Sequence, residues 1–438
     1  MSALPPGPRS TLLTTIRIAR TPTEAMLEYR EKYGDPFFLP MGNGPIVVTA
    51  QPELIKAMFA NRDVQQFGPF AFEATRALVG DHSVLMMNGE AHKRERKLLN
   101  PPFHGERMRA YGEVMIEATR AAFAELKPGQ EFIALDHTTR VSLEAIVRAV
   151  FGFSTQAQIE QAQQAVRAAL TAAKPYLLFS PKTQVAPFGL GPWATYQKRS
   201  KAFDDLLYAQ IAATREDSEG REDILAMLVN ARYDDGSAMA DSDIRDELRT
   251  LLIAGHETTA VSLAWSLYAI HRHEGVLERV QAELDALPED AGPAELSRLP
   301  HLNATIDETL RLYPIVEVVF RRLLRPMSFA GFDLPAGITL CPAITLVHLD
   351  PEVYPDPRRF DPERFMGKKP RPHQYLPFGG GNRRCIGAAF SLYESRLALA
   401  TLLREYEFEL LDGELPAVRK NVVMAPKGGV RMRVKGRR

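Results

Sequence analysis

The central region of the chain, from about Arg107 to about Leu312, most strongly limits the folds that this sequence can adopt. It is rich in Ala, Leu, Glu, Arg and Gln, and its apolar residues recur at three- and four-residue spacing. That pattern predicts a bundle of long helices. We expect the helical part of the fold to span about 90–312 and to return at about 386–406.

Short apolar runs bounded by Pro and Gly flank the helical region and predict strands. These β-rich parts lie at about 35–60 and 315–350, followed by strands near the C-terminus. No internal repeat or Gly/Ser linker divides the chain, so we expect one domain over 1–438, mainly α with a minor β region, an α+β fold. The segment Ala172–Trp193, rich in Pro, Gly and aromatics, is either a mobile lid or a long turn, and we favour the turn.

The charge and cysteine content exclude several classes of protein. The 54 basic and 54 acidic residues cancel, which gives no global reason to expect a nucleic-acid partner. With Cys341 and Cys385 as its only cysteines, the chain cannot be a disulfide scaffold, and a reducing cytosol suits it. No stretch approaches the roughly 18–20 apolar residues of a membrane span, and the first residues do not resemble a signal peptide. We therefore expect a soluble, cytoplasmic protein without a membrane anchor.

Cys385 lies where a glycine-rich loop enters a predicted helix. A helix N-terminus stabilises a thiolate, which can act as a nucleophile or as a metal ligand. A nucleophile needs a nearby base, and no local His or Asn signature supplies one. The glycines Gly379–Gly381 match neither a dinucleotide-binding motif nor a phosphate-binding P-loop. A lone cysteine is more often a buried small hydrophobe, so its neighbours decide the interpretation.

Those neighbours follow the pattern F-x-x-G-x-R-x-C-x-G, whose five fixed positions are occupied by Phe378, Gly381, Arg383, Cys385 and Gly387. This pattern resembles the haem-thiolate signature of the cytochrome P450 family. Further family motifs follow in the right order: Glu308 and Arg311 as E-x-x-R, Pro362–Phe365 as P-E-R-F, and Ala254–Thr259 as A-G-x-E-T-T. The resemblance covers essentially the whole chain.

The resemblance implies a haem b cofactor whose iron is bound by the Cys385 thiolate, with Phe378 and Gly379 beside the sulfur. The haem propionates need buried cationic partners. By family position these are His92, Arg96, Arg321 and Arg383. The alternative for each is a surface charge. Arg321 is preferred to its neighbour Arg322 by counting back from Gly331.

His256–Ala260 admits a competing interpretation, because H-E-x-x-H marks zinc proteases. The second His is replaced by Ala260, so the zinc-protease interpretation fails. The resemblance implies instead that Gly255 leaves room for O2 and substrate, that Thr258 holds activated oxygen and a water, and that Glu257 relays protons. The alternative for Thr258 is a hydroxyl bonded to its own helix backbone.

Glu308, Arg311 and Arg364 resemble the buried folding network of the family. As a bare i,i+3 pair, Glu308 and Arg311 would usually be a solvated ion pair. Because the implied role is structural, we do not count these residues as catalytic.

The resemblance also implies a pocket for a lipophilic small molecule, such as a fatty acid, a terpenoid or steroid, or a polyketide. Its expected contacts are Phe70, Phe179, Ala254 and Val318. Glu317 either bonds a polar group of the substrate or turns to solvent, and we favour solvent because an unpaired buried charge is costly.

Two cysteines cannot hold an iron–sulfur cluster and no flavin domain is encoded, so we expect a separate electron donor. The implied donor is a ferredoxin or flavodoxin with its reductase, and the implied enzyme is a monomeric monooxygenase. Four basic residues (Lys93, Arg94, Arg96 and Lys97), with Arg384, form either a docking face for that donor or a solvated surface. A peroxide-driven or rearranging P450, and a haem-thiolate sensor without enzymatic activity, are the competing interpretations.

Overall fold

The computed structural model describes residues 4–42, 44–61, 63, 65–68, 73–153, 155–174, 176–177, 181–367 and 370–438. The chain divides into two compact units, each assembled from separate stretches of sequence. Unit 1 comprises Met1–Phe70, Asn88–Lys93 and Asp307–Cys385, and unit 2 comprises Ala71–Met87, Arg94–Ile306 and Ile386–Arg438.

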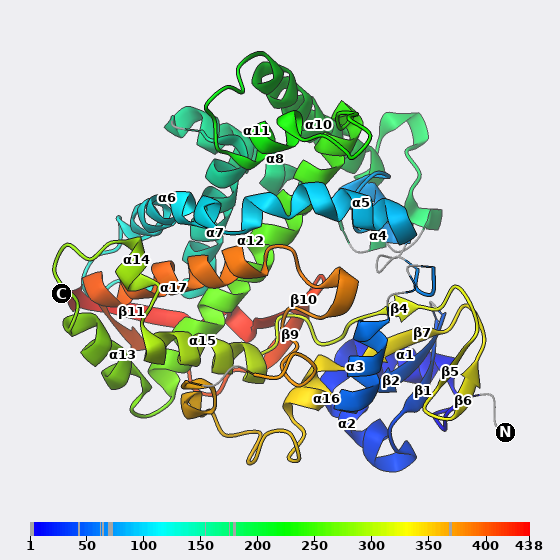
Figure 1. The fold of residues 1–438 in the computed structure, drawn as a ribbon. Coiled ribbons are helices and arrows are strands. Elements are labelled where there is room, and N and C mark those ends of the chain that lie inside the picture. The colour runs from blue at the N-terminus through cyan, green and yellow to red at the C-terminus, as the bar shows by residue number, and fades with distance from the viewer. Residues whose placement is uncertain are drawn as a thin grey trace. The chain divides into compact units, whose positions relative to one another are not determined.

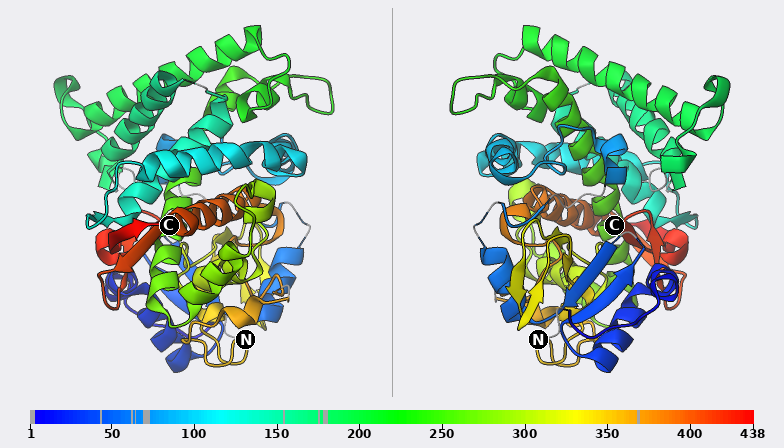
Figure 2. Two further views of the ribbon diagram at one scale, coloured as in Figure 1. Left: turned by 90° about the vertical axis from the view of Figure 1, so that its left-hand side faces the viewer. Right: turned by 90° about the vertical axis from the view of Figure 1, so that its right-hand side faces the viewer.

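A four-stranded sheet organises unit 1. Its order is β1 (Phe37–Met41), β2 (Gly44–Thr49), β7 (Thr339–Pro342) and β4 (Arg321–Arg322). Strands β2 and β7 run parallel although about 290 residues of sequence separate them, and the other pairs are antiparallel. The right-hand view of Figure 2 shows the blue hairpin β1–β2 among the strands of this unit. The sheet thus joins the first residues of the chain to the segment that leads to Cys385.

Helices and a second hairpin complete unit 1. They are α1 (Thr11–Arg20), α2 (Pro22–Tyr33), α3 (Pro52–Ala60), α16 (Ile344–His348), β5 (Met327–Phe329) and β6 (Phe332–Leu334). Phe37, Val48 and Leu346 belong to one buried apolar cluster, which places the core between the sheet and its helices. Strands β2 and β7 carry apolar side chains on both faces of the sheet. The near-continuous apolar sequence PIVVT of β2 is typical of a strand that is buried on both faces.

The helix α12 (Asp241–Arg272) is the centre of unit 2. It contacts α7 (Ala134–Phe151), α10 (Pro192–Glu216) and α17 (Ala388–Glu405), and Figure 1 shows it in green among them. All its residues from Thr259 to Ile270 are buried, because this stretch is apolar or small on every side. The helix is therefore a core element along its second half.

The remaining elements frame this centre. In unit 2 they are α4 (Glu73–Val79), α6 (Glu106–Phe123), α8 (Gln156–Ala172), α11 (Ile224–Asn230), α13 (Val276–Asp285), α14 (Pro293–Leu296), β3 (Glu131–Ile133), β8 (Tyr406–Leu410), β9 (Ala417–Lys420), β10 (Val423–Pro426) and β11 (Arg431–Arg437). The helices α5 (Gly89–Leu99) and α15 (Pro300–Leu312) carry residues of both units. Across the described residues, none of the helices combines the length and the apolarity that crossing a bilayer requires.

The predicted mainly helical α+β architecture is confirmed, with three local differences. Pro52–Ala60, inside the range of about 35–60 that was predicted to be β-rich, is the helix α3. Ile344–His348 was expected as strand and is the helix α16, because a short apolar run does not distinguish a strand from a buried helix. The C-terminal strand β11 pairs with β8 on one side and with β3 on the other, and β3 lies inside the region predicted to be helical. The β structure is thus divided between sheets in both units.

Glu394 is a buried carboxyl on α17, and burial raises its pKa to about 8, although the Ser142 side chain of α7 acts to lower it. Because the pKa of Glu394 is higher in the folded protein than the unfolded value of 4.5, burying this carboxyl costs no stability below pH 4.5. The cost in stability grows as the pH rises from 4.5 to about 8. We expect Glu394→Gln to raise the free energy of unfolding by about 2 kcal/mol at pH 8 and to change it little at pH 5. Urea unfolding at the two pH values measures this, and the exposed Glu407→Gln is the control. An equal gain at both pH values would contradict the assignment.

Candidate functional site

The loop before α17 is closed by backbone hydrogen bonds, one of which is made by Cys385. The Cys385 N–H donates to the carbonyl of Phe378 at 2.9 Å, and the Gly379 N–H donates to Leu376 at 2.9 Å. Gly379 and Gly381 adopt left-handed backbone angles, φ 63° and 65°, which favour glycine. The Cys385 side chain is exposed and precedes the first residue of α17, Ala388, by three positions. The sequence prediction of a cysteine between a glycine-rich loop and a helix is therefore confirmed.

Close packing against Phe59 of α3 explains the other glycine of the loop. A Cβ on Gly380 would lie 2.2 Å from the Phe59 ring, and one on Gly381 would lie 2.8 Å from the Phe59 carbonyl oxygen. No side chain fits at that separation. The glycines thus fix the loop against α3 inside unit 1.

Arg321 is a buried cation next to the same loop. Its side chain is 5% exposed, and its guanidinium donates to the carbonyls of Phe320 and Gly380, both at 2.9 Å. Burial, together with the nearby cation of Arg383, lowers its pKa to about 10. Among the described residues no carboxylate pairs with Arg321. The buried Arg321 and the half-buried Arg383 beside the Cys385 loop therefore suit an anionic group, such as a haem propionate.

The other predicted propionate partners lie on this loop and on α5. Arg383 donates to Asn88 Oδ1 at 3.2 Å, which brings the loop to the start of α5. On that helix His92 is buried and Arg96, four residues further on, is half-buried. His92 is therefore not a surface residue, which was the alternative interpretation given for it from the sequence. The contacts of these side chains with haem stay predictions.

The predicted network of Glu308, Arg311 and Arg364 is present and buried. Arg311 donates to both oxygens of Glu308, at 2.6 and 2.7 Å, and both side chains are fully buried. Arg364 approaches Glu308 at 3.6 Å, and the Asp361 N–H donates to Glu308 at 2.7 Å. The remaining Arg311 donors bond three carbonyls, those of His348, Pro357 and Arg359. The network thus joins α15 to the chain that leads to the cysteine loop.

His348 extends this network to the cysteine loop, and sequence reasoning missed it. Its Nδ1 lies 3.0 Å from the carbonyl oxygen of Arg311, and its Nε2 accepts the Leu376 N–H at 2.9 Å. Those partners require the neutral tautomer with a proton on Nδ1. Burial, with Arg311 nearby, lowers the pKa of His348 to about 3. A histidine in the mostly apolar run ITLVH was the one signal of a paired, buried role.

We expect His348→Ala to reduce the fraction of protein that gives a thiolate-type carbon monoxide spectrum, because the Leu376 N–H and the Arg311 carbonyl lose their partner. Each unpaired buried group costs about 1–3 kcal/mol. Since the folded pKa is depressed, the stabilisation from neutral His348 is complete above pH 6.5 and is lost as the pH falls towards 3.

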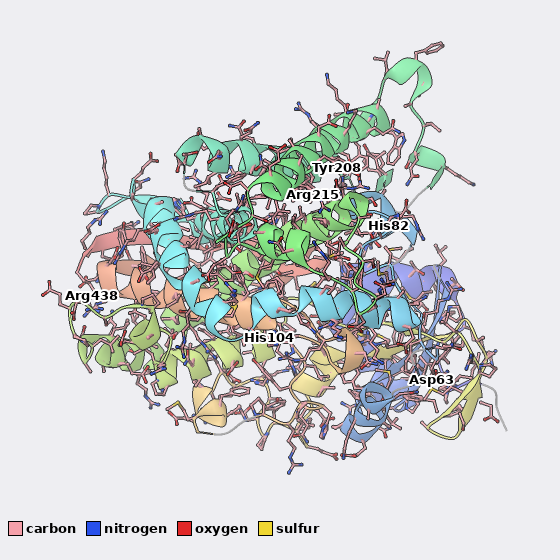
Figure 3. All side chains as sticks on the ribbon, turned by 45° about the horizontal axis from the view of Figure 1, so that its top comes forward. Asp63, His82, His104, Tyr208, Arg215 and Arg438 are labelled. Atoms are coloured by element: carbon pink, nitrogen blue, oxygen red, sulfur yellow. The ribbon has the colours of Figure 1, made fainter. Side chains whose placement is uncertain are left out.

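His348→Gln, which keeps a donor and an acceptor, should restore part of the thiolate signal. His104, labelled in Figure 3, is exposed, and its ring nitrogen Nδ1 lies 2.8 Å from the Asn100 carbonyl oxygen, so His104→Ala is the control. Equal spectra for His348→Ala and His104→Ala would show that His348 does not hold the loop.

The helix α12 carries the predicted oxygen-activating residues of unit 2. The Thr258 hydroxyl donates to the carbonyl of Ala254 at 2.7 Å, which is the backbone contact that the alternative interpretation described. A Cβ on Gly255 would meet Ile146 of α7 at 3.3 Å. The structure therefore accounts for this glycine by helix packing, whereas the sequence interpretation assigned it to ligand space.

Glu257 is half-buried, and burial raises the pKa of its carboxyl. Lys420 at the end of β9 and the side chain of Asn421, which follows it, oppose that shift. A carboxyl with a raised pKa both binds and releases protons nearer neutral pH, as a proton relay requires. This observation is consistent with the predicted relay and does not depend on haem.

The predicted substrate contacts are only partly described. Ala254 is exposed on α12, and Val318 is half-buried and bridges to Ala343 in unit 1. Phe70 and Phe179 lie outside the described residues. The prediction that Glu317 turns to solvent was wrong: its side chain is buried and accepts a hydrogen bond from Thr23 of α2 at 2.8 Å. That partner removes the cost on which the prediction rested.

Comparison with known proteins agrees with these observations. The sequence model of the family Cytochrome P450 matches residues 4–431. The chain is 36% identical to cytochrome P450 135B1 of Mycobacterium tuberculosis over 99% of its length and 92% of that protein's length. It is 35% identical to cytochrome P450 138 of the same species, over 89% of this chain and 86% of that one.

Solved structures show the same fold. The retinoic acid-bound cyanobacterial CYP120A1 superposes with a TM-score of 0.85 at 24% identity, covering 98% of this chain and 99% of that one. The heme domain of cytochrome P450DA gives 0.86 at 24% identity, covering 99% and 98%. The chain belongs to the cytochrome P450 family, and it is a haem-thiolate monooxygenase whose iron is bound through cysteine.

Proposed function

We propose that this enzyme hydroxylates or epoxidises a hydrophobic small molecule with O2, taking electrons from a separate ferredoxin- or flavodoxin-type partner and its reductase. The substrate classes that we favour are fatty acids, terpenoids or steroids, and polyketides. We further propose a monomeric, cytoplasmic enzyme built as a single domain.

The described geometry supports the following proposed roles for the predicted site residues. Cys385 is the proposed ligand of the iron, and Arg321 and Arg383, with His92 and Arg96, are the proposed partners of the propionates. A haem bound through a thiolate supplies the electron density that favours O–O cleavage. Phe378 and Gly379 shape the loop that presents the sulfur. The apolar side chains of Ala254 and Val318, with Phe70 and Phe179, are the proposed substrate contacts.

The observation that carries the oxygen-driven reaction is the pair Glu257 and Thr258 on α12. Glu257 has a raised pKa caused by burial, and the neighbouring Thr258 has a hydroxyl whose proton is engaged with the Ala254 carbonyl. The hydroxyl oxygen keeps lone pairs that accept from a water. An acid that exchanges protons beside an alcohol that positions water suits proton delivery during O2 activation. A peroxide-driven enzyme has no need of that delivery.

The basic residues on α5 give less support to donor docking than their sequence suggested. Arg94 pairs with Asp235 at 3.1 Å and covers the Tyr233 ring at 3.8 Å, and Lys97 pairs with Asp234 at 2.5 Å. These acids neutralise part of the cluster. We therefore retain the separate electron donor in the proposal but assign it no docking residues.

Turnover of NADPH with surrogate ferredoxin and reductase tests the proposed function. We expect Thr258→Ala and Glu257→Gln to lower product formed per NADPH by about tenfold or more, with H2O2 rising in its place. Thr258→Ser and Glu257→Asp, which keep the hydroxyl and the carboxyl, should recover much of the coupling. Product formation that is driven equally well by H2O2 alone and is unaffected by these changes would refute the oxygen-driven mechanism. Ligand binding without turnover would identify a sensor.

A further inference from the structure

The segment of residues 80–84, between α4 and α5, is bound to α12 through carboxyl groups of that helix. The His82 N–H donates to Asp246 Oδ2 at 2.8 Å, and the Val84 N–H donates to Glu247 Oε1 at 2.6 Å. Both carboxyl groups belong to residues that are 0% exposed. Buried acids of α12 therefore hold the backbone of this segment.

Two side-chain contacts hold the same segment. The hydroxyls of Ser83 and Thr250 lie 2.7 Å apart in the interior. The ring of His82, labelled in Figure 3, is exposed, and its Nδ1 lies 2.8 Å from Asp243 Oδ1. The position of the segment thus depends on several titratable groups, of which His82 is the one that solvent reaches most easily.

A second buried carboxyl, Glu95 of α5, belongs to the same cluster. Glu95 is 3% exposed, and its Oε2 accepts a hydrogen bond from the Tyr233 hydroxyl at 2.8 Å. Its other oxygen, Oε1, is buried and has no hydrogen-bond partner among the described residues, and the same holds for Glu247 Oε2. Each carboxyl thus has one satisfied oxygen and one unsatisfied oxygen, which is costly for a buried group.

The charges around Glu247 are mainly negative. The charged groups that act most strongly on its carboxyl are Glu95, Asp246 and Asp243, all of them acids. Burial and this repulsion raise the pKa of Glu247 well above its usual value. Burial also raises the pKa of Glu95, with Asp243 acting in the same direction.

The cations near the cluster pair with other acids. They are Arg245 (Asp246 at 2.9 Å and Asp204 at 3.2 Å), Arg249 (Asp204 at 2.6 Å) and Arg94 (Asp235 at 3.1 Å). Arg245 and Arg249 therefore compensate the charge of Asp246. Arg94 and His82 favour the charged form of Glu95, but burial outweighs them. Charge compensation thus reaches Asp246 much better than it reaches Glu247.

We propose that Glu247 and Glu95 hold one proton between them, and that this proton keeps residues 80–84 bound to α12. A proton on Glu247 Oε2 makes that oxygen a donor, for which the unsatisfied Glu95 oxygen is an acceptor, directly or through a water. Both unsatisfied oxygens then have a partner, and Glu247 Oε1 stays on the Val84 N–H.

Loss of the proton to solvent reverses this arrangement. Two buried negative charges then repel each other, and Glu247 turns towards water and leaves the Val84 N–H. Because the pKa of Glu247 is raised by folding, its contribution to holding the segment is complete below 4.5 and is lost as the pH rises through the folded pKa. The segment, which leads into α5, is therefore ordered at low pH and released at high pH. This switch goes beyond the proposed function because it needs no haem, electron donor or substrate.

Hydrogen exchange of the full-length protein at pH 6 and pH 9, read by mass spectrometry, tests the proposal. Rates are divided into the intrinsic rates at each pH, which gives a protection factor for each peptide. We expect the protection factor of a peptide covering residues 80–86 to fall by about tenfold or more at pH 9. Peptides from the buried half of α12 should keep theirs, which separates local release from global unfolding.

Two variants of the acid pair test its role. Glu247→Gln keeps an acceptor for Val84 and cannot ionise, so its protection factor at pH 9 should stay within about twofold of the value at pH 6. Glu95→Gln removes the repelling charge and should reduce the fall to about threefold or less. The shared proton itself has a direct signature, because the infrared carbonyl band of a protonated carboxylic acid at pH 6 should lose intensity in Glu247→Gln.

Two control variants separate this pair from other titrating groups. Glu394→Gln removes another buried carboxyl without hydrogen-bond partners among the described residues, on α17, and should leave the fall in protection unchanged. His82→Gln removes the imidazole that faces Asp243 and keeps the backbone N–H, so the fall should persist in it as well.

Three results would overturn the proposal. They are equal protection of residues 80–86 at the two pH values in the unmodified protein, an undiminished fall in Glu247→Gln, or a fall that disappears in His82→Gln, which would make the His82–Asp243 pair the switch. Because hydrogen exchange requires no catalysis, its outcome is separate from the test of the monooxygenase.

Discussion

Cys385→Ser is expected to abolish the thiolate-type carbon monoxide spectrum of the reduced protein and to lower turnover by at least a hundredfold. The thiolate favours O–O cleavage, and a serine hydroxyl does not supply the same electron density. The loop should survive the change, because the Cys385 backbone N–H donates to Phe378 whichever of the two side chains is present. The measurement is the difference spectrum of the dithionite-reduced protein with and without carbon monoxide, together with the haem content.

Cys341→Ser is the control for this experiment. Cys341 lies on β7, its side chain is 2% exposed, and burial raises the pKa of its thiol, so it is held as a neutral thiol. Its substitution should cost some stability and leave the thiolate band in place. A thiolate band that persists in Cys385→Ser, or that disappears in Cys341→Ser at equal haem content, would contradict Cys385 as the iron ligand.

The sequence predicted the helical part of the fold better than the β part, for a physical reason. Helices such as α12 and α17 carry a local period in their own sequence, and burial of that pattern decides their structure. Sheet pairing depends on contacts distant in sequence. Strand β2 pairs with β7, and β11 pairs with β3, across about 290 residues or more, and no local pattern specifies such partners.

The site residues were predictable from the sequence where the chemistry requires one residue type at a motif position. They were less predictable where tertiary packing decides which residues meet. The motif identified the Cys385 loop and the Glu308–Arg311 pair, and both have the expected local structure. Glu317 and His348 are different, because their partners Thr23 and Leu376 come from other elements. Spacing along the chain does not show such partners, so one residue was assigned to solvent and the other was missed.

Arg311→Met is expected to lower the free energy of unfolding by about 3–5 kcal/mol, because it leaves the Glu308 carboxylate buried without its bidentate partner. Arg364, at 3.6 Å, is too far to replace two short hydrogen bonds, and three backbone carbonyls also lose a donor. Unfolding in urea, followed by haem release and by circular dichroism, measures the change. The control is Lys56→Met on α3, whose partner Glu53 is also three residues away but is 76% exposed, and it should cost less than about 1 kcal/mol. Since the two pairs share their spacing and differ in burial, similar losses in both variants would show that burial does not give the network its strength.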